Sequence, residues 1–355
     1  MCKGKNRMES STKTKNVYSN DSPYKSMKAR IEYIDLLRCI GIILMIMGHT
    51  GFGSVFSKWI HCFHMPMFFI ISGYMYKEMP LSKLVLRRSK SLLIPYFVFG
   101  LIHCAIYFAV YGFDTKVLFS FFWENTNGNM PIAGALWFLT AMFCTEIFFW
   151  FTQHANLSTL WVTIIAFFIA VGGMILAKYL PFRLPFAIDV GLVGVGLYQI
   201  GKLIKDKWNK IINTNIWVAL ICLTLFSLLG FVNGDVNLKK GLYGIWPLFW
   251  INAVGITVSL WNISRILYNW VQRKKILKQL FSYLQEIGQN SIVYLCMNQL
   301  AIFINRNIFD LILPVSNNMV LLGRNIIIFP LTMIELYLLQ KLIMNTKIRV
   351  IVGKF

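Results

Sequence analysis

Charged residues are scarce in this chain of 355 residues. Together Asp, Glu, Lys and Arg make up 14% of it, against about 25% in a typical soluble domain. Hydrophobic residues make up 57%, and the mean hydropathy is +0.60. This composition excludes an ordinary soluble protein and favours a protein that crosses a membrane several times.

Several other patterns are missing. The sequence has no series of alternating ten-residue segments, which a membrane barrel would need, so helical spans are expected. None of the seven cysteines belongs to a Cys-x-x-Cys pair, and we expect neither a disulfide framework nor a metal site. The net charge is +21, but no basic module interleaved with aromatics indicates a nucleic-acid partner. We instead expect basic residues to fill cytoplasmic loops.

The chain divides into a polar tail and one apolar domain. Residues 1–30 are basic and lack the apolar core of a secretory signal, so we predict a disordered cytoplasmic tail. Residues 31–355 are predicted to form one integral-membrane domain, an all-α bundle of about ten spans. These spans are expected near 34–52, 59–76, 91–111, 133–151, 159–177, 186–204, 214–232, 242–262, 289–311 and 319–341.

Charge bias gives the predicted orientation. With the N-terminus inside, the cytoplasmic segments hold 26 Lys and Arg residues, whereas the external loops hold six. Positive residues favour the cytoplasmic side, so both termini are predicted to be cytoplasmic.

The first predicted span carries ionisable residues that are expensive in hydrocarbon and therefore indicate a functional site. On a helix Arg38 and His49 share a face about 16 Å apart, and Asp35 lies close to that face. Arginine suits phosphate and histidine suits proton transfer, so this stripe is typical of a site for a long anionic donor. The alternative is a structural Asp35–Arg38 pair, with His49 bonded to a backbone carbonyl.

The second span adds His61 and His64, followed by Pro66, which should kink the helix beside them. The pair lacks an acidic neighbour, so metal binding is not expected. Ser72 and Gly73 follow near the cytoplasmic end, where glycine also permits close helix packing.

Later segments supply further candidates. Arg87 and Arg88 lie in the next cytoplasmic loop, where they are candidates for binding donor phosphates or simply reflect topology. In the fourth span lie Trp137 and the intramembrane Glu146, which needs a cationic partner such as Arg38 or a loop cation.

The run from Arg30 to His49, followed by Phe63-His64-Met65-Pro66-Met67-Phe68-Phe69 and Ser72-Gly73-Tyr74, resembles the acyltransferase 3 membrane family. It looks closest to the fucose 4-O-acetylase-like subgroup. The resemblance implies about ten helices in the cell membrane. It also implies transfer of an acyl group, usually acetyl from acetyl-CoA, to a hydroxyl of a surface glycan or its lipid-linked precursor. One departure is Asn298, which stands where relatives often carry a late histidine.

On this interpretation His49 is the general base and His64 assists. Arg38, Arg87, Arg88, Ser72 and Gly73 would bind acyl-CoA, with Asp35 orienting Arg38. The acceptor would contact Trp137, Glu146 and Asn298. A flippase for a lipid-linked sugar or anion is the main alternative, and a glycan polymerase is a third. The sequence leaves the oligomeric state and the acceptor sugar open.

Overall fold

The computed structural model describes residues 31–126, 132, 134–312 and 317–354, with the backbone only at 276. The predicted tail 1–30 lies outside the described residues. Within the described part, six helices are long and apolar enough to cross a membrane. They cover 32–50, 81–111, 159–179, 185–206, 291–312 and 318–344. The protein is therefore a helical membrane bundle, and its ten spans and the side of each terminus stay predictions.

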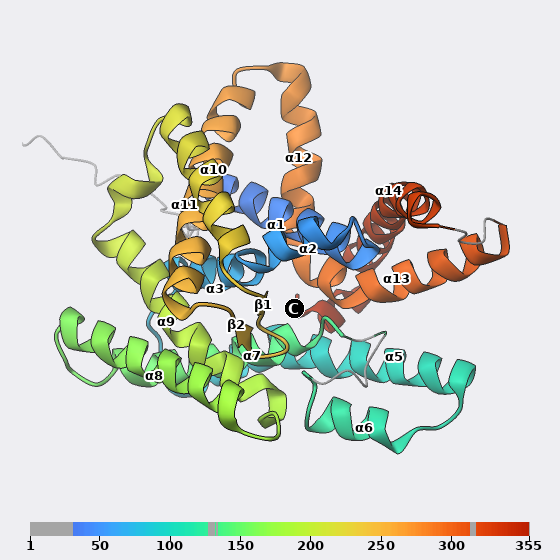
Figure 1. Ribbon diagram of the computed structural model, residues 1–355, viewed down its shortest axis with the longest axis horizontal. Coiled ribbons are helices and arrows are strands. Elements are labelled where there is room, and N and C mark those ends of the chain that lie inside the picture. The colour runs from blue at the N-terminus through green and yellow to red at the C-terminus, as the bar shows by residue number, and fades with distance from the viewer. Residues whose placement is uncertain (1–30, 127–131, 133, 313–316, 355) are drawn as a thin grey trace, which may run out of the picture. The chain divides into compact units, whose positions relative to one another are not determined.

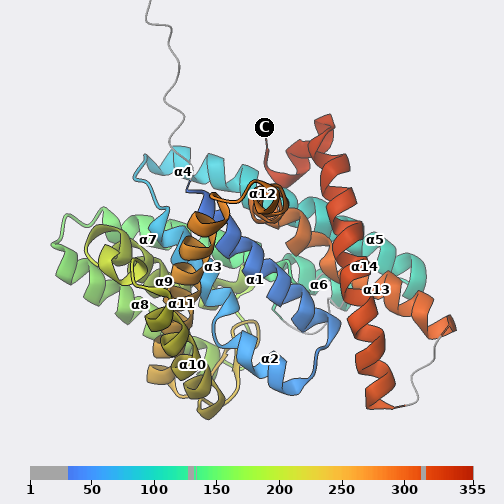
Figure 2. The same ribbon diagram turned by 90° about the horizontal axis from the view of Figure 1, so that it is seen from above.

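The first helix, α1 (Glu32–Thr50), lies at the centre of the bundle. It packs against α11 (Trp246–Val271), α12 (Lys275–Gln289) and α13 (Ser291–Ile312), and also against α3 (His64–Tyr74). Figures 1 and 2 both show α1 between the α3–α11 side and the α13–α14 side, where α14 is Asn318–Met344. In this position, both ends of α1 contact helices that are distant in sequence.

The second predicted span is broken. Helix α2 (Ser54–His61) ends before Cys62, and α3 begins at His64. The ring of a proline clashes with the carbonyl four residues earlier, here that of Cys62, so the break falls where Pro66 requires it. Pro66 itself lies in the first turn of α3, where its missing N–H costs no helical bond. The kink predicted beside the histidines is confirmed.

The loop before the third predicted span contains the donor candidates Arg87 and Arg88, and the fourth span contains Trp137 and Glu146. Helix α4 (Leu81–Arg88) continues through a π-helical turn (Ser89–Leu93) into α5 (Ile94–Tyr111). Beyond it come α6 (Thr115–Phe122) and α7 (Trp137–Gln153). Helix α7 packs along α9 (Ile188–Asp206). It also contacts the π-helical turn, so the residues that precede α5 lie against the buried face of α7.

Small residues allow α9 to run through the core. Helix α9 is almost entirely buried and packs against α3, α7 and α8 (Thr159–Tyr179). A Cβ atom at Gly73 would collide with the backbone of Tyr198, and one at Gly201 would collide with the backbone of Ile70. These two glycines therefore set the close crossing of α3 and α9.

A short β-hairpin follows α10 (Ile216–Val232) and precedes α11 in the chain. Its strands are β1 (Val236–Asn237) and β2 (Leu242–Tyr243), which pair antiparallel. Asn233 closes the base of the loop by accepting a hydrogen bond from the Ile245 N–H at 2.7 Å. Strand β1 contacts α2, and residues 237–239 line a cavity together with His49 of α1.

One predicted loop contains a helix. Residues 263–288 were expected to connect two spans, yet α12 occupies most of the segment. Leu36 of α1 packs in a hydrophobic cluster with Val271 and Phe281, and Gly288 lies against the backbone of Asp35. The apolar face of this amphipathic helix covers the N-terminal end of α1.

Candidate active site

The N-terminal end of α1 holds the residues predicted to bind a donor. Arg38 forms an ion pair with buried Asp35, with Nη1 and Oδ1 3.3 Å apart. The hydroxyl of Tyr198, on α9, lies 3.9 Å from Met142 Sδ, and both Ser72 and the charge of Arg38 act on it. The candidates Asp35, Arg38 and Ser72, from α1 and α3, therefore share one neighbourhood with Tyr198.

Glu146 has the loop cation that its buried position requires. Arg88 forms an ion pair with it, and the Glu146 residue is only 2% exposed. The charges of both partners also act on Tyr198, so this pair belongs to the same neighbourhood. Arg87 is exposed at the end of α4. Glu146 thus lies on the side of Arg38, away from the cavities at His49.

Gly73 and Asn298 have packing roles in the structure. Gly73 permits the close approach of α3 and α9. Asn298 is fully buried and donates hydrogen bonds to the Tyr294 and Leu295 carbonyls of its own helix at 2.9 and 2.8 Å. Contact with a ligand remains a prediction for both residues.

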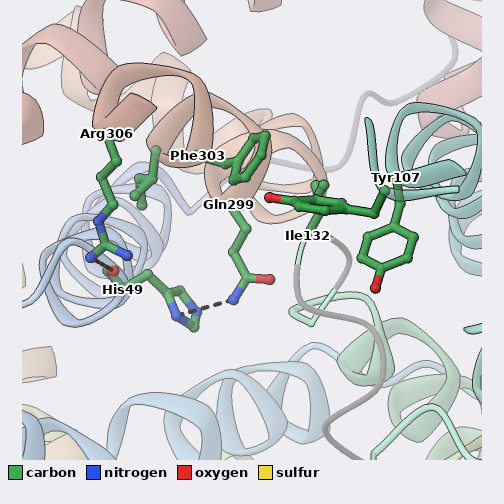
Figure 3. Close-up of a pocket in the computed structure, with 8 residues that line it drawn as sticks. His49, Tyr107, Ile132, Gln299, Phe303 and Arg306 are labelled. Carbon is green, nitrogen blue, oxygen red and sulfur yellow. Dashed lines mark hydrogen bonds between the residues drawn. The ribbon is translucent and has the colours of Figure 1, made fainter. Parts of the chain in front are cut away.

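At the other end of α1, two cavities meet at His49 and Gln299. The larger measures about 390 Å³ and extends towards α5 and α13, and Figure 3 shows part of its lining. Its other walls come from Tyr107, Tyr111, Ile132, Ile302, Phe303 and Arg306. Gln299 reaches His49 directly, with its Nε2 3.3 Å from His49 Nδ1 (Figure 3).

The smaller cavity measures about 110 Å³ and lies on the other side, towards α2, α3 and the hairpin. Besides His49 and Gln299, it is lined by Met45, His61, His64, Met65, Gly134, Ala135, Trp137, Asn237, Leu238 and Lys239. The predicted residues His49, His64 and Trp137 therefore converge on one space. The hairpin adds a cation that was not predicted.

The broken second span positions His61 and His64. Their Nδ1 atoms lie 2.6 Å from the Ser57 and Ile60 carbonyl oxygens, respectively. Because a carbonyl only accepts, Nδ1 carries the proton, and Nε2 of each neutral ring keeps a lone pair. The rings pack edge to face with centroids 5.3 Å apart. Both Nδ1 atoms are thus engaged, and both side chains line the smaller cavity beside His49.

Arg306 stabilises the last turn of α1. Its Nη2 donates to the carbonyls of His49 at 3.0 Å and Thr50 at 2.8 Å. These carbonyls lack helical partners at a C-terminus, and a cation suits that end of the helix dipole. Arg306 therefore holds the backbone of His49 while its own side chain lines the larger cavity.

Lys239 changes the electrostatics of the smaller cavity. It is half-buried, and its positive charge acts on His49. Burial lowers the pKa of the Lys239 amine from its ordinary value, and the charge of Lys240 lowers it further. The cation thus faces the cavity from outside the spanning helices.

Sequence reasoning did not assign Gln299, Arg306 or Lys239 to the site. Arg306 is an intramembrane arginine, and that alone is a signal of function. Gln299 follows Asn298, which stands at the position of the expected late histidine, and it is Gln299 rather than Asn298 that lines the two cavities at His49. Nothing in the sequence indicated a role for Lys239, because the segment that forms the hairpin resembles an ordinary external loop.

Comparison with known proteins identifies the family of the chain. Residues 31–338 match the model of the acyltransferase domain that defines the acyltransferase 3 family. The match covers most of the chain, which therefore belongs to this family of membrane acyltransferases. No curated protein and no solved structure matches the chain.

Proposed function

We propose that the protein is an O-acyltransferase of the cell membrane, similar to the fucose 4-O-acetylase-like subgroup. It transfers an acetyl group from acetyl-CoA to a hydroxyl of a surface glycan or its lipid-linked precursor. The observation that carries the proposal is the meeting of two cavities at one histidine. Transfer needs a donor and an acceptor side by side with a base between them.

The sizes of the two cavities support a different substrate for each. The smaller cavity, about 110 Å³, suits the acetyl thioester and is too small for a sugar. The larger, about 390 Å³, lies within the range of ligand pockets and carries Tyr107, Tyr111 and Phe303 on its walls. The aromatic faces suit a sugar ring, and the acceptor hydroxyl would approach His49 from that side.

The donor would extend along α1. Arg38 and His49 lie eleven residues apart on one continuous helix, which corresponds to about 16 Å. This spacing suits CoA phosphates at the Arg38 end and a pantetheine arm that carries the thioester towards His49. Ser72, Arg87 and Arg88 are the nearby groups proposed to complete the phosphate site, with Asp35 orienting Arg38.

The chemistry proposed at His49 is direct transfer. The imidazole takes the proton of the acceptor hydroxyl as its oxygen attacks the thioester carbonyl. The tetrahedral intermediate then expels the CoA thiolate, which takes that proton from the imidazolium. Lys239 would stabilise the charge on the carbonyl oxygen, and His64 would help shape the acyl side. The products are an acetyl ester and CoA.

Gln299 is proposed to position the imidazole. Its amide can present either end to Nδ1, and its Oε1 is buried and has no hydrogen-bond partner within the described residues. With Oε1 turned to the ring it would accept from Nδ1–H, which leaves the lone pair on Nε2 for the hydroxyl proton.

The test is transfer from radiolabelled acetyl-CoA by the purified protein in nanodiscs, with membrane glycans as acceptor. Label should appear in glycan as alkali-labile ester together with free CoA. A flippase or polymerase would release no CoA. Absence of both label transfer and CoA release from correctly folded protein would overturn the proposal.

A further inference from the structure

The larger cavity has a cation on its wall. Arg306 lines it together with His49. The same side chain also lines a more open hollow of about 570 Å³, with Ser54, Ser57, Leu321, Arg324 and Asn325 among its walls. Arg306 therefore lies between the base and the surface, where an incoming acceptor would pass.

Most half-buried or buried arginines of the described residues have a carboxylate partner. Arg38 pairs with Asp35, Arg88 with Glu146, Arg183 with Asp189, and Arg324 with Asp310. Arg306 and Arg265 differ, since neither forms an ion pair within the part of the chain that the structure describes. Asp310 is close enough to act on Arg306, but its ion pair is with Arg324.

Arg265 and Arg306 use their nitrogens differently. Arg265 directs both Nε and Nη2 to the carbonyls of Ile212 and Thr214, and it lines neither cavity at His49. Arg306 directs only Nη2 to carbonyls, and its Nε is buried and lacks a hydrogen-bond partner within the described residues. Capping α1 therefore leaves part of the Arg306 guanidinium available.

No described residue lining the two cavities at His49 or the open hollow is acidic. The Nε–H of Arg306 is buried, and a buried donor is costly unless it has a hydrogen-bond partner. A planar carboxylate or phosphate would satisfy the remaining donors of Arg306. Tyr107, Tyr111 and Phe303 would meanwhile contact the sugar to which the anion is attached.

We infer that the acceptor is an anionic glycan, whose carboxylate or phosphate binds Arg306 while its hydroxyl faces His49. The inference rests on the proposed function and adds the chemical class of the acceptor. A neutral sugar would leave the guanidinium with the carbonyls of His49 and Thr50 but without an anionic partner. The charge should therefore lie on the acetylated residue or on the group linked directly to it.

The experiment maps O-acetyl esters on surface glycans of source cells with and without the gene, by NMR and mass spectrometry. Esters that disappear on deletion should lie on, or next to, a residue with a negative charge. A uronate or other acidic sugar identifies a carboxylate, and a phosphodiester identifies a phosphate. Esters lost only from glycans without such charges would overturn the inference. Unchanged esters would instead overturn the transferase proposal.

Complementation tests Arg306 itself. Arg306→Gln should restore less than about a tenth of the esters, since charge-assisted bonds contribute about 1.5–3 kcal/mol, and Arg306→Lys should restore more. Arg265→Gln, which removes a capping arginine outside the cavities, serves as the matched control. Membrane abundance and thermal stability of the purified protein report folding. A folded Arg306→Gln protein that restores wild-type acetylation would overturn the role of Arg306.

Discussion

The two ends of α1 differ in how their charges are satisfied. At the N-terminal end, Arg38 and Arg88 both have carboxylate partners within the protein. At the C-terminal end, His49 borders two cavities, and Arg306 contacts backbone carbonyls rather than a carboxylate. Charges that are paired within the protein form a preorganised framework. Polar groups that line a cavity and keep unused hydrogen-bonding atoms are available to bind a substrate. Under the proposed function, this difference is consistent with chemistry at the His49 end and donor positioning at the Arg38 end.

The largest expected effect is an all-or-none difference in membrane sidedness. Reporters fused at the C-terminus and inserted near Gly112–Asp114 should give opposite signals, because the charge bias predicts cytoplasmic termini. Alkaline phosphatase and green fluorescent protein fusions provide the measurement. Matching signals would remove the basis for cytoplasmic donor entry at Arg38.

Replacing the base should have the next largest effect. His49→Ala is expected to lower acetyl transfer by about 10²–10⁴-fold, the usual contribution of general acid–base catalysis. His154→Ala, which changes an exposed histidine at the end of α7, is the control and should leave the rate unchanged. Retention of more than about a tenth of activity would move the chemistry away from His49.

Arg38→Lys should weaken donor binding by about 10–100-fold, because lysine lacks the planar fork for phosphate. The effect should appear mainly in KM for acetyl-CoA. Steady-state kinetics with varied acetyl-CoA measure it. An unchanged KM with a much lower kcat would show that Arg38 takes part in the reaction itself. The two ends of α1 would then no longer differ in role.

Adjacent residues on α13 sharpen the comparison further. Gln299→Ala should lower kcat by about 2–10-fold, the value of one positioning hydrogen bond, with little change in KM for acetyl-CoA. Asn298→Ala should instead lower stability by about 1 kcal/mol and leave kcat near wild type. Thermal unfolding and kinetics separate the two. The reverse pattern would give Asn298 the role assigned to Gln299.

The smallest effect concerns pH. Burial lowers the pKa of Lys239, so its positive charge is lost at a lower pH than that of an exposed lysine. Activity should therefore fall a few-fold as the pH rises and Lys239 loses its charge. Lys239→Arg should keep the activity up to a higher pH, because arginine stays charged. Lys240→Arg, at the exposed neighbour, should not move the alkaline limb of the kcat/KM profile. Identical profiles for all three proteins would exclude Lys239 from the site.

Some features were predictable because they depend on local chemistry. The helix from Glu32 to Thr50 follows from its apolar run, and helical geometry alone puts Arg38 and His49 on one face. The break before α3 follows from Pro66, and the need of Glu146 for a cation follows from the cost of a buried charge. These statements needed no knowledge of which helices are neighbours.

The rest depends on tertiary packing. That His49 contacts Gln299, 250 positions away, follows from α1 packing against α13, which no periodicity reveals. The same packing gives Arg306 the end of α1 to cap, whereas Lys239 reaches the cavity at His49 through the β1–β2 hairpin, which contacts α2. By itself the sequence determined the membrane-spanning class, the family resemblance and the charged stripe of the first span, because hydropathy and helical pitch are local. Only the tertiary structure decided which groups share the cavities, because that depends on how helices distant in sequence pack together.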